Sequence, residues 1–354
     1  MITAKKVLLL AVGGGNDAVS SLLAVAQLRR DHQFSPETLD VLCPLPEGAT
    51  YHNLRATDIP DLHEIAANTY RTIGPKRITN FPEAKLSTSG YFHRYYGADL
   101  RHGSLGLLQV LRALAPQYDL VLCVDVGGDF IAQDSNQNLL SPYMDSTVAY
   151  AVQHLTGVSV LGMVLGLSLD GESTPEQARA AVTAVVPSYS GRLTPDIMRF
   201  EAVYYRETIR PIRRSQTGDL LTDYILEGLR PHTHTYNRKF HLPSQKFSVD
   251  IERRLEPWCY DSYILFDPMT IRNRLIVPTQ NGLDWVRKTQ TSQRRLCHEL
   301  VSQTCEEVFV ATIPDIFHEQ HDAIVRGLQD CMHAGTITAS IGYRCDGPFS
   351  ETLP

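Results

Sequence analysis

The sequence predicts an α/β protein with a doubly wound, mostly parallel, Rossmann-like sheet that is covered by helices on both faces. Short apolar runs alternate along the chain with segments whose apolar residues recur at helical spacing. Several of the apolar runs also end in glycines and carboxylates, as expected at the ligand-binding edge of such a sheet. With 354 residues, the chain is long enough for two domains or for one large unit.

The first half of the chain gives the clearest elements. The apolar run 7–12 is followed by three glycines and is expected to be the first buried strand. A helix at 18–30 should come after it. Between 46 and 103 the chain is polar and aromatic with little periodicity, which is typical of a lid or substrate loop. The remaining elements are strands at 41–45, 120–124 and 158–165 and helices at 105–114, 142–155 and 175–185.

Beyond residue 187 the pattern weakens. A strongly basic helix is expected at 199–214, followed by a basic loop rich in histidine and proline at 230–246. We expect a core at 1–190, with glycine-rich turns at its strand ends, and a C-terminal α/β extension at 191–354 that belongs to the same unit. The weaker elements are strands at 263–267, 274–277 and 308–312, helices near 293–304 and 318–332, and an irregular tail after 341.

The composition restricts the class of protein. The formal net charge of -6 gives no electrostatic reason to approach nucleic acid or an anionic membrane, so neither partner is expected. No stretch reaches the roughly 18 consecutive apolar residues of a membrane helix. The seven cysteines lack CxxC spacing, which favours a reducing cytoplasm and mostly inert buried thiols. The composition is compatible with a homo-oligomer.

Carboxylates at the strand ends are the main candidates for chemistry. Asp125 follows four apolar strand residues, and Asp129 comes after the turn residues Gly127 and Gly128. A buried carboxylate is costly unless it meets a cation, donors or a polar ligand. Asp17 lies in the corresponding place after the first strand. These three aspartates are the expected catalytic residues, with a hydrogen-bonded brace of the turn as the structural alternative.

A larger set of residues is expected to bind substrate or cofactor around the same edge. Backbone N–H groups of a glycine turn at a helix N-terminus form a site for anions, although Asn16 or Asp17 could instead cap the helix. A helix starting at Pro142 would bring its N-cap and its first turn to this edge. Arg94 would hold an acidic group of the substrate. The binding set is Gly13, Gly14, Gly15, Asn16, Gly127, Gly128, Ser141, Asp145, Asp170 and Arg94.

The clustered aspartates are compatible with two kinds of chemistry. Together they could hold Mg²⁺ or Ca²⁺, which both prefer oxygen ligands. Without a metal, crowding of like charges would raise the pKa of one carboxyl group and suit it to general acid or base work. The glycine turn is neither GxGxxG nor GxxxxGK[ST], which disfavours a kinase-like phosphate loop.

Several of these motifs resemble one family. The opening LLLAVGGGNDA at 8–18, VDVGGD at 124–129, SPYMD at 141–145 and DGE at 170–172 are similar to the family catalogued as domain of unknown function 1152. The resemblance spans nearly the whole chain and implies a single enzyme-like α/β unit, but it supplies no substrate. Asn16 departs from the family's glycine run. The first turn also resembles, more distantly, the Ca²⁺- and ribose-binding turn of nucleoside hydrolases, whose doubled aspartates are absent here.

Three functions follow as hypotheses. The favoured one is a hydrolase or transferase of small-molecule metabolism that acts on a nucleotide-, nucleoside- or phosphate-containing substrate with the strand-end carboxylates. The first alternative is a lyase, cyclase or isomerase of an amino-acid-derived metabolite, in which the carboxylates move a proton. The second alternative is a protein that binds a metabolite without transforming it.

Overall fold

The computed structural model describes the chain in stretches. They comprise residues 2–13, 15–45, 50–73, 76–78, 81–133, 142–212, 215–242, 245–282, 284–285, 288–289, 308–310 and 340–344.

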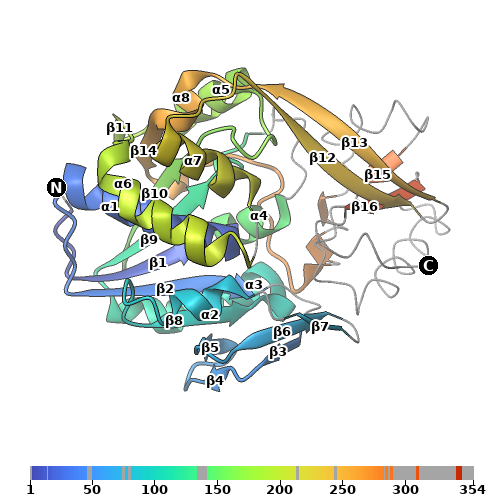
Figure 1. Ribbon diagram of the computed structural model, residues 1–354. Helices are drawn as coiled ribbons and strands as arrows, with labels where there is room; N and C mark the ends of the chain where they lie inside the picture. The colour runs from blue at the N-terminus through green and yellow to red at the C-terminus, as the bar shows by residue number, and fades with distance from the viewer. Residues whose placement is uncertain are drawn as a thin grey trace.

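A nine-stranded, largely parallel sheet forms the centre of this part of the chain (Figure 1). The strand order is β11-β14-β10-β9-β1-β2-β8-β5-β4. The strands from β10 to β8 are parallel to one another, and antiparallel strands extend the sheet on both sides. The parallel strands are β1 (Lys6–Ala11), β2 (Thr38–Leu45), β8 (Tyr95–Asp99), β9 (Leu120–Val126) and β10 (Ser159–Leu165). The antiparallel strands are β4 (Arg55–Ala56), β5 (Leu62–Glu64), β11 (Tyr189–Arg192) and β14 (Ser262–Phe266).

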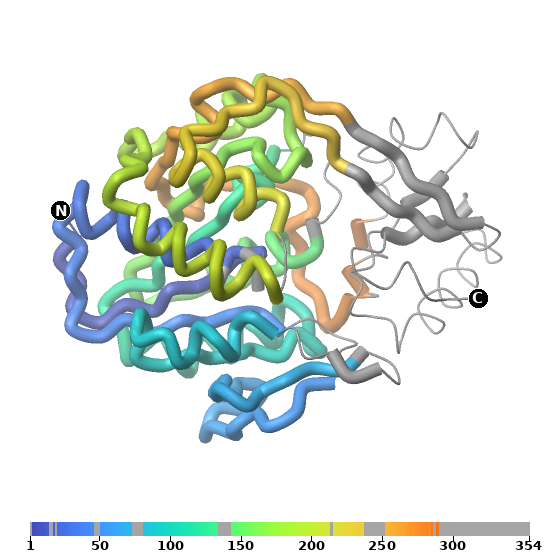
Figure 2. Tube along the Cα trace, viewed as in Figure 1, coloured from blue at the N-terminus to red at the C-terminus, as the bar shows by residue number. Residues whose placement is uncertain are grey.

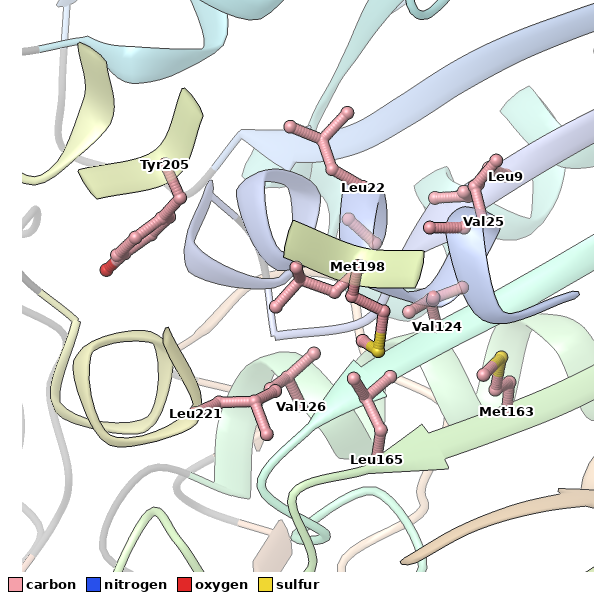
Figure 3. Packing of buried hydrophobic residues seen from close by; sticks show 14 of the residues in the cluster. Leu9, Leu22, Val25, Val124, Val126, Met163, Leu165, Met198, Tyr205 and Leu221 are labelled. Carbon is pink, nitrogen blue, oxygen red and sulfur yellow. The ribbon is translucent and has the colours of Figure 1, made fainter. Parts of the chain in front are cut away.

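Helices cover both faces of the sheet, as the sequence predicts, because the central strands are apolar on both sides. One face packs against α1 (Gly15–Asp31), α2 (Pro82–Leu86), α6 (Pro195–Tyr204), α7 (Gln216–Glu227) and α8 (Pro257–Asp261). The other packs against α3 (Gly103–Leu114), α4 (Pro142–Gln153) and α5 (Pro175–Val185). Figure 3 shows how Leu22 and Val25 of α1, Met198 of α6 and Leu221 of α7 meet the strands on the first face.

The order of the strands reverses at β1. The chain runs from β1 to β2 and β8 on one side, then returns to place β9 and β10 on the other side. The carboxyl ends of β1 and β9 therefore flank the switch point, where open α/β sheets bind ligands. Ala11 pairs with Val124, and the Val12 amide donates to the Val124 carbonyl at 3.0 Å, so these two ends are level.

Two smaller sheets lie beside the central one. A long hairpin leaves the α/β body near α5 and α8 (Figure 1), and a separate ribbon contains three of the five strands between β2 and α2. The coloured trace in Figure 2 follows the same chain path through the body. The hairpin sheet holds β12 (Thr233–Leu242), β13 (Gln245–Arg254), β15 (Val308–Val310) and β16 (Ser340–Arg344). The ribbon holds β3 (Thr50–His52), β6 (Tyr70–Ile73) and β7 (Lys76–Ile78).

Short helical turns complete the described secondary structure. They are the 3-10 turns η1 (Leu100–His102), η2 (Ala115–Gln117) and η4 (Pro268–Thr270) and the π-helical segment η3 (Tyr205–Ile209).

Some predicted elements are wrong. The region 46–103 is not one loop, because Tyr95 begins a central strand and is only 1% exposed. The expected helix 199–214 ends as an α-helix at Tyr204, and the basic stretch after 230 is a strand rather than a loop. The expected strand 274–277 is a turn, in which Asn273 accepts from the Leu275 amide. The expected helices at 293–304 and 318–332 lie outside the described residues.

The C-terminal half contributes directly to the central sheet. β14 pairs with β10, and α6 packs on α1. In the described part of the chain, no helix is both long enough and apolar enough to cross a membrane. Cys43, Cys123 and Cys259 are buried and are not joined to one another by disulfide bonds.

Candidate functional site

The first carboxylate of the site is Asp17, in the first turn of α1 directly after β1. Its side chain turns back toward the strand end, where Oδ2 accepts a hydrogen bond from the Gly13 amide at 2.6 Å. A Cβ at Gly13 would lie 2.8 Å from the same oxygen, so glycine is needed for this close approach. The Gly13 N–H is therefore already used, which removes one donor from the predicted anion-binding turn.

The second carboxylate is Asp125, next to the last residue of β9. The side chain is 1% exposed, and its Oδ2 accepts from the Gly128 amide at 3.1 Å. Gly127 has a φ of 143°, and a Cβ there would lie 2.7 Å from Asp170 Oδ2. The sequence VDVGGD thus folds into a turn that brings the ends of β9 and β10 together.

The third carboxylate, Asp145, comes from the first turn of α4 on the opposite face of the sheet and is 4% exposed. One oxygen each of Asp17, Asp125 and Asp145 can be chosen so that all three lie within 4.8 Å of one another. Carboxylates from α1, β9 and α4 therefore converge on one point. Among the described residues, this trio is the one group with the spacing of metal ligands.

More carboxylates lie around this trio. Asp129 and Asp170 are partly buried, and Glu172 is 2% exposed. Asp170 Oδ1 accepts from the Glu172 amide at 2.9 Å, which fixes the turn after β10. Glu172 belongs to the DGE motif at 170–172 but is not among the predicted site residues. The acidic end of that strand was the signal that pointed to it.

Burial and mutual repulsion raise the pKa values of these groups. Burial raises the pKa of Asp17 to about 7, although hydrogen bonds from the Gly13 and Val126 amides oppose the rise. Burial, followed by the charges of neighbouring carboxylates, holds the pKa values of Asp125, Asp129 and Asp145 well above the usual range. At neutral pH the cluster therefore retains protons unless a cation balances its charge.

The cluster offers acceptors and few donors. Asp125 Oδ1 and Asp145 Oδ1 are buried without a hydrogen-bond partner. The amides of Gly13 and Gly128 donate to the cluster's own aspartates, and the Gly127 amide donates to the Leu165 carbonyl at 3.1 Å. A ligand that fits this arrangement must bring positive charge or hydrogen-bond donors.

The hairpin braces the acidic turn from outside. Tyr236 of β12 is fully buried against Gly171 and donates to the Leu169 carbonyl at 2.8 Å. Arg253 of β13 donates through Nε to the Gly171 carbonyl at 3.1 Å. No local sequence pattern indicated these contacts, because they join residues more than 60 positions apart.

Other predicted binding residues lie elsewhere. Arg94 precedes β8 near the level of Leu8, several residues before the carboxyl end of β1, and its guanidinium donates to Tyr96 Oη at 3.1 Å. The structure therefore does not bring Arg94 to the acidic cluster. Arg210, in the basic segment, pairs with Asp219 and Asp223 of α7. Gly15 begins α1 and Asn16 follows it, but Gly14, Ser141 and the Asn16 side chain lie outside the described part.

Comparison with known proteins gives a family and no further relative. No curated protein and no solved structure gives a significant match to the chain. The family model described as "Protein of unknown function (DUF1152)" matches residues 8–194, which include the acidic residues after β1, β9 and β10. Because that match covers more than half of the 354 residues, the chain belongs to the DUF1152 family.

Proposed function

We propose that the protein is a small-molecule enzyme, a hydrolase or transferase, whose acidic cluster binds Mg²⁺ or Ca²⁺ and, through the cation, a nucleotide-, nucleoside- or phosphate-containing substrate. The observation that carries the proposal is the convergence of Asp17, Asp125 and Asp145. Their oxygens lie within 4.8 Å of one another, and two of these residues hold a buried oxygen with no hydrogen-bond partner. Oxygen ligands at such spacing suit hard divalent cations.

A cation resolves the mismatch between this site and an anionic substrate. A phosphate placed directly against several carboxylates would be repelled, and the amides of Gly13 and Gly128 are already used within the protein. A bound Mg²⁺ commonly joins one or two carboxylates to substrate phosphate oxygens, and Ca²⁺ accepts hydroxyl and carbonyl oxygens as well. The acidic cluster therefore supports a cation-dependent enzyme better than a direct phosphate-binding loop.

The carboxylates that do not hold the cation have a separate role in this proposal. Asp129 has a raised pKa because of burial and of the charges on Asp125 and Asp170. A carboxyl group whose pKa is raised in this way can protonate a leaving oxygen while it holds its proton, and can receive a proton from an attacking water once it is ionised. Asp129 is thus the proposed general acid or base.

The test compares two variants that remove one acidic charge each. Asp125→Asn changes the cluster, whereas Asp58→Asn changes an exposed aspartate far along the chain. Thermal unfolding is measured with Mg²⁺ or Ca²⁺ and with a panel of nucleotides, nucleosides and sugar phosphates. We expect the cation to raise the melting temperature of the wild type and of Asp58→Asn but not of Asp125→Asn.

Turnover of any substrate found in that panel should need the cation and should fall by about 10²-fold or more in Asp125→Asn. Full activity of Asp125→Asn would contradict the proposal. So would a melting temperature that neither cation changes.

A second candidate rests on the protonation of Asp17. Burial raises the pKa of Asp17 to about 7, which suits a base that removes a proton at neutral pH without a metal. This favours the lyase, cyclase or isomerase hypothesis for an amino-acid-derived substrate. Turnover that persists in the presence of a chelator and is lost in Asp17→Asn would support it over the cation-dependent enzyme.

A further inference from the structure

A second buried polar cluster lies outside the acidic site, between the β3–β6 ribbon, α2 and β8. Tyr51 of β3 and Arg71 of β6 are directly opposite each other in an antiparallel pair, so their side chains leave the same face of the ribbon. The Tyr51 ring lies 5.7 Å from the ring of Phe81, which directly precedes α2. Glu83 of α2 and Tyr95 of β8 are 2% and 1% exposed.

Each of these four residues holds a buried polar atom that has no hydrogen-bond partner. They are Tyr51 Oη, Arg71 Nε, Glu83 Oε2 and Tyr95 Oη. Arg71 is 9% exposed, yet none of the ion pairs formed by the described residues includes Arg71 or Glu83. An arginine stays charged in proteins, and although Arg71 lies near the Tyr51 hydroxyl, a buried positive charge without a counter-charge is strongly unfavourable.

The four groups share one electrostatic environment. Burial raises the pKa of Tyr51, while the nearby Arg71 lowers it, both through its charge and as a side-chain donor, and the charge of Glu83 raises it. Burial and the Glu83 charge also raise the pKa of Tyr95. Both hydroxyls therefore keep their protons at neutral pH and are able to donate. The cluster presents one cation, one anion and two neutral hydroxyls, in contrast to the acidic site.

We infer that this cluster is a second binding site, and that it recognises the α-ammonium and α-carboxylate groups of a free amino acid. The Arg71 guanidinium has the planar donor geometry that binds carboxylates. Glu83 Oε2 accepts from an ammonium group, and the two tyrosine hydroxyls supply further hydrogen bonds. A zwitterion leaves the site neutral, whereas a phosphate or a simple carboxylate would leave Glu83 uncompensated.

The inference does not depend on the proposed function. The second site contains none of the acidic-cluster residues, and it is tested by amino-acid binding and not by turnover. Buried polar atoms that lack hydrogen-bond partners lower the stability of the ligand-free protein. Removing one of these groups should therefore not destabilise the protein when no ligand is bound.

The experiment measures thermal unfolding and calorimetric binding of the full chain with each of the twenty common L-amino acids. n-Butylamine and butyrate serve as probes that carry only one of the two groups. The variants are Arg71→Met and Glu83→Gln, with Arg55→Met as the matched control, because Arg55 is an exposed arginine on neighbouring β4. Tyr95→Phe removes one unpartnered hydroxyl while keeping the ring.

We expect at least one amino acid to raise the melting temperature of the wild type, and neither single-group probe to do so. Its affinity should fall by about 10-fold or more in Arg71→Met and Glu83→Gln and stay unchanged in Arg55→Met. Without ligand, Arg71→Met should melt at the same temperature as the wild type or higher. Tyr95→Phe, whose fold is the least at risk, should weaken binding by about 3- to 10-fold.

Two results would overturn the inference. One is that no amino acid binds to the wild type, which would leave ordered water as the partner of these atoms. The other is that Arg71→Met and Glu83→Gln melt well below the wild type while amino-acid binding to Tyr95→Phe is unchanged, since that pattern belongs to a structural network. Either result leaves the cation-dependence of the acidic site untouched.

Discussion

The two buried polar clusters differ in the sign of their charges. The acidic cluster gathers Asp17, Asp125 and Asp145 with further carboxylates, and its charged groups repel one another. The cluster beneath the β3–β6 ribbon combines Arg71 with Glu83 and holds no excess charge. Both leave buried atoms without hydrogen-bond partners. The comparison shows that burial alone does not define the ligand: like charges require a counter-charge from outside, while balanced charges require a partner with both signs.

This difference in charge predicts how the stability of the protein depends on pH, and the acidic cluster should have the largest effect. A carboxyl group whose pKa is raised on folding stabilises the protein below its unfolded pKa of about 4, and this contribution is lost as the pH rises through its folded pKa. Asp17, with a pKa of about 7, places that loss between about pH 4 and pH 7, and the raised pKa values of Asp125 and Asp145 add to it. Without divalent cation, the free energy of unfolding should therefore decline over this range.

A divalent cation should reverse that decline, because it binds the deprotonated carboxylates. At a concentration one hundred times its dissociation constant, it should add about 2.7 kcal/mol to the free energy of unfolding at neutral pH and less at acid pH. Urea unfolding from pH 5 to pH 8, with and without Mg²⁺ or Ca²⁺, measures both curves, and Asp17→Asn should flatten the cation-free one. Parallel curves at all pH values would show that the acidic cluster does not hold the cation.

An effect of similar size is expected at the turn that supports the acidic cluster. Gly127→Ala places a Cβ 2.7 Å from Asp170 Oδ2 at a residue with a φ of 143°, so both strain and collision oppose it. Gly157→Ala is the matched control, because Gly157 also has a positive φ of 83° but has no atom within 4 Å of the added Cβ. We expect a loss of about 2–4 kcal/mol for Gly127→Ala and about 1 kcal/mol for Gly157→Ala.

Chemical denaturation of the two glycine variants gives these free energies directly. Cation binding should also weaken in Gly127→Ala alone, since Gly127 positions the ends of β9 and β10. Equal destabilisation of both variants would mean that the contact with Asp170 contributes nothing to the turn.

The acidic cluster was predictable because it depends on local signals and on one topological rule. The sequence predicts strands at 7–12 and 120–124, which the structure has as β1 and β9, and in parallel sheets the carboxyl ends of such strands meet at one edge. Asp17 and Asp125, which follow these two predicted strands, do converge, although β9 extends past Asp125 to Val126. The parallel core and the helices of the first half were predictable for the same reason, as shown by α5, which spans Pro175–Val185 as expected.

The second cluster was not predictable, because no spacing rule joins its residues. Tyr51 and Arg71 meet only through an antiparallel pairing inside a stretch that lacks periodicity, and Tyr95 belongs to a strand that resembled part of a loop. The same limit applies to Arg94, whose charge suggested a substrate contact but whose position along β8 is set by tertiary pairing with β2. Long-range contacts of this kind leave no local trace in a single sequence.

The smallest effect sharpens the comparison through two buried tyrosines. Tyr118 Oη donates to Asp40 at 2.6 Å, whereas Tyr95 Oη has no partner. Tyr118→Phe removes a hydrogen bond to a buried carboxylate and should cost about 1–3 kcal/mol of unfolding free energy. Tyr95→Phe removes a hydroxyl that makes no hydrogen bond in the ligand-free protein. Without ligand, the unfolding free energy of this variant should therefore differ from that of the wild type by less than about 0.5 kcal/mol, or be higher. Urea unfolding of both variants measures the difference. A Tyr95→Phe loss as large as that of Tyr118→Phe would mean that the Tyr95 hydroxyl already has a stabilising partner in the free protein, and that the second cluster is satisfied without a ligand.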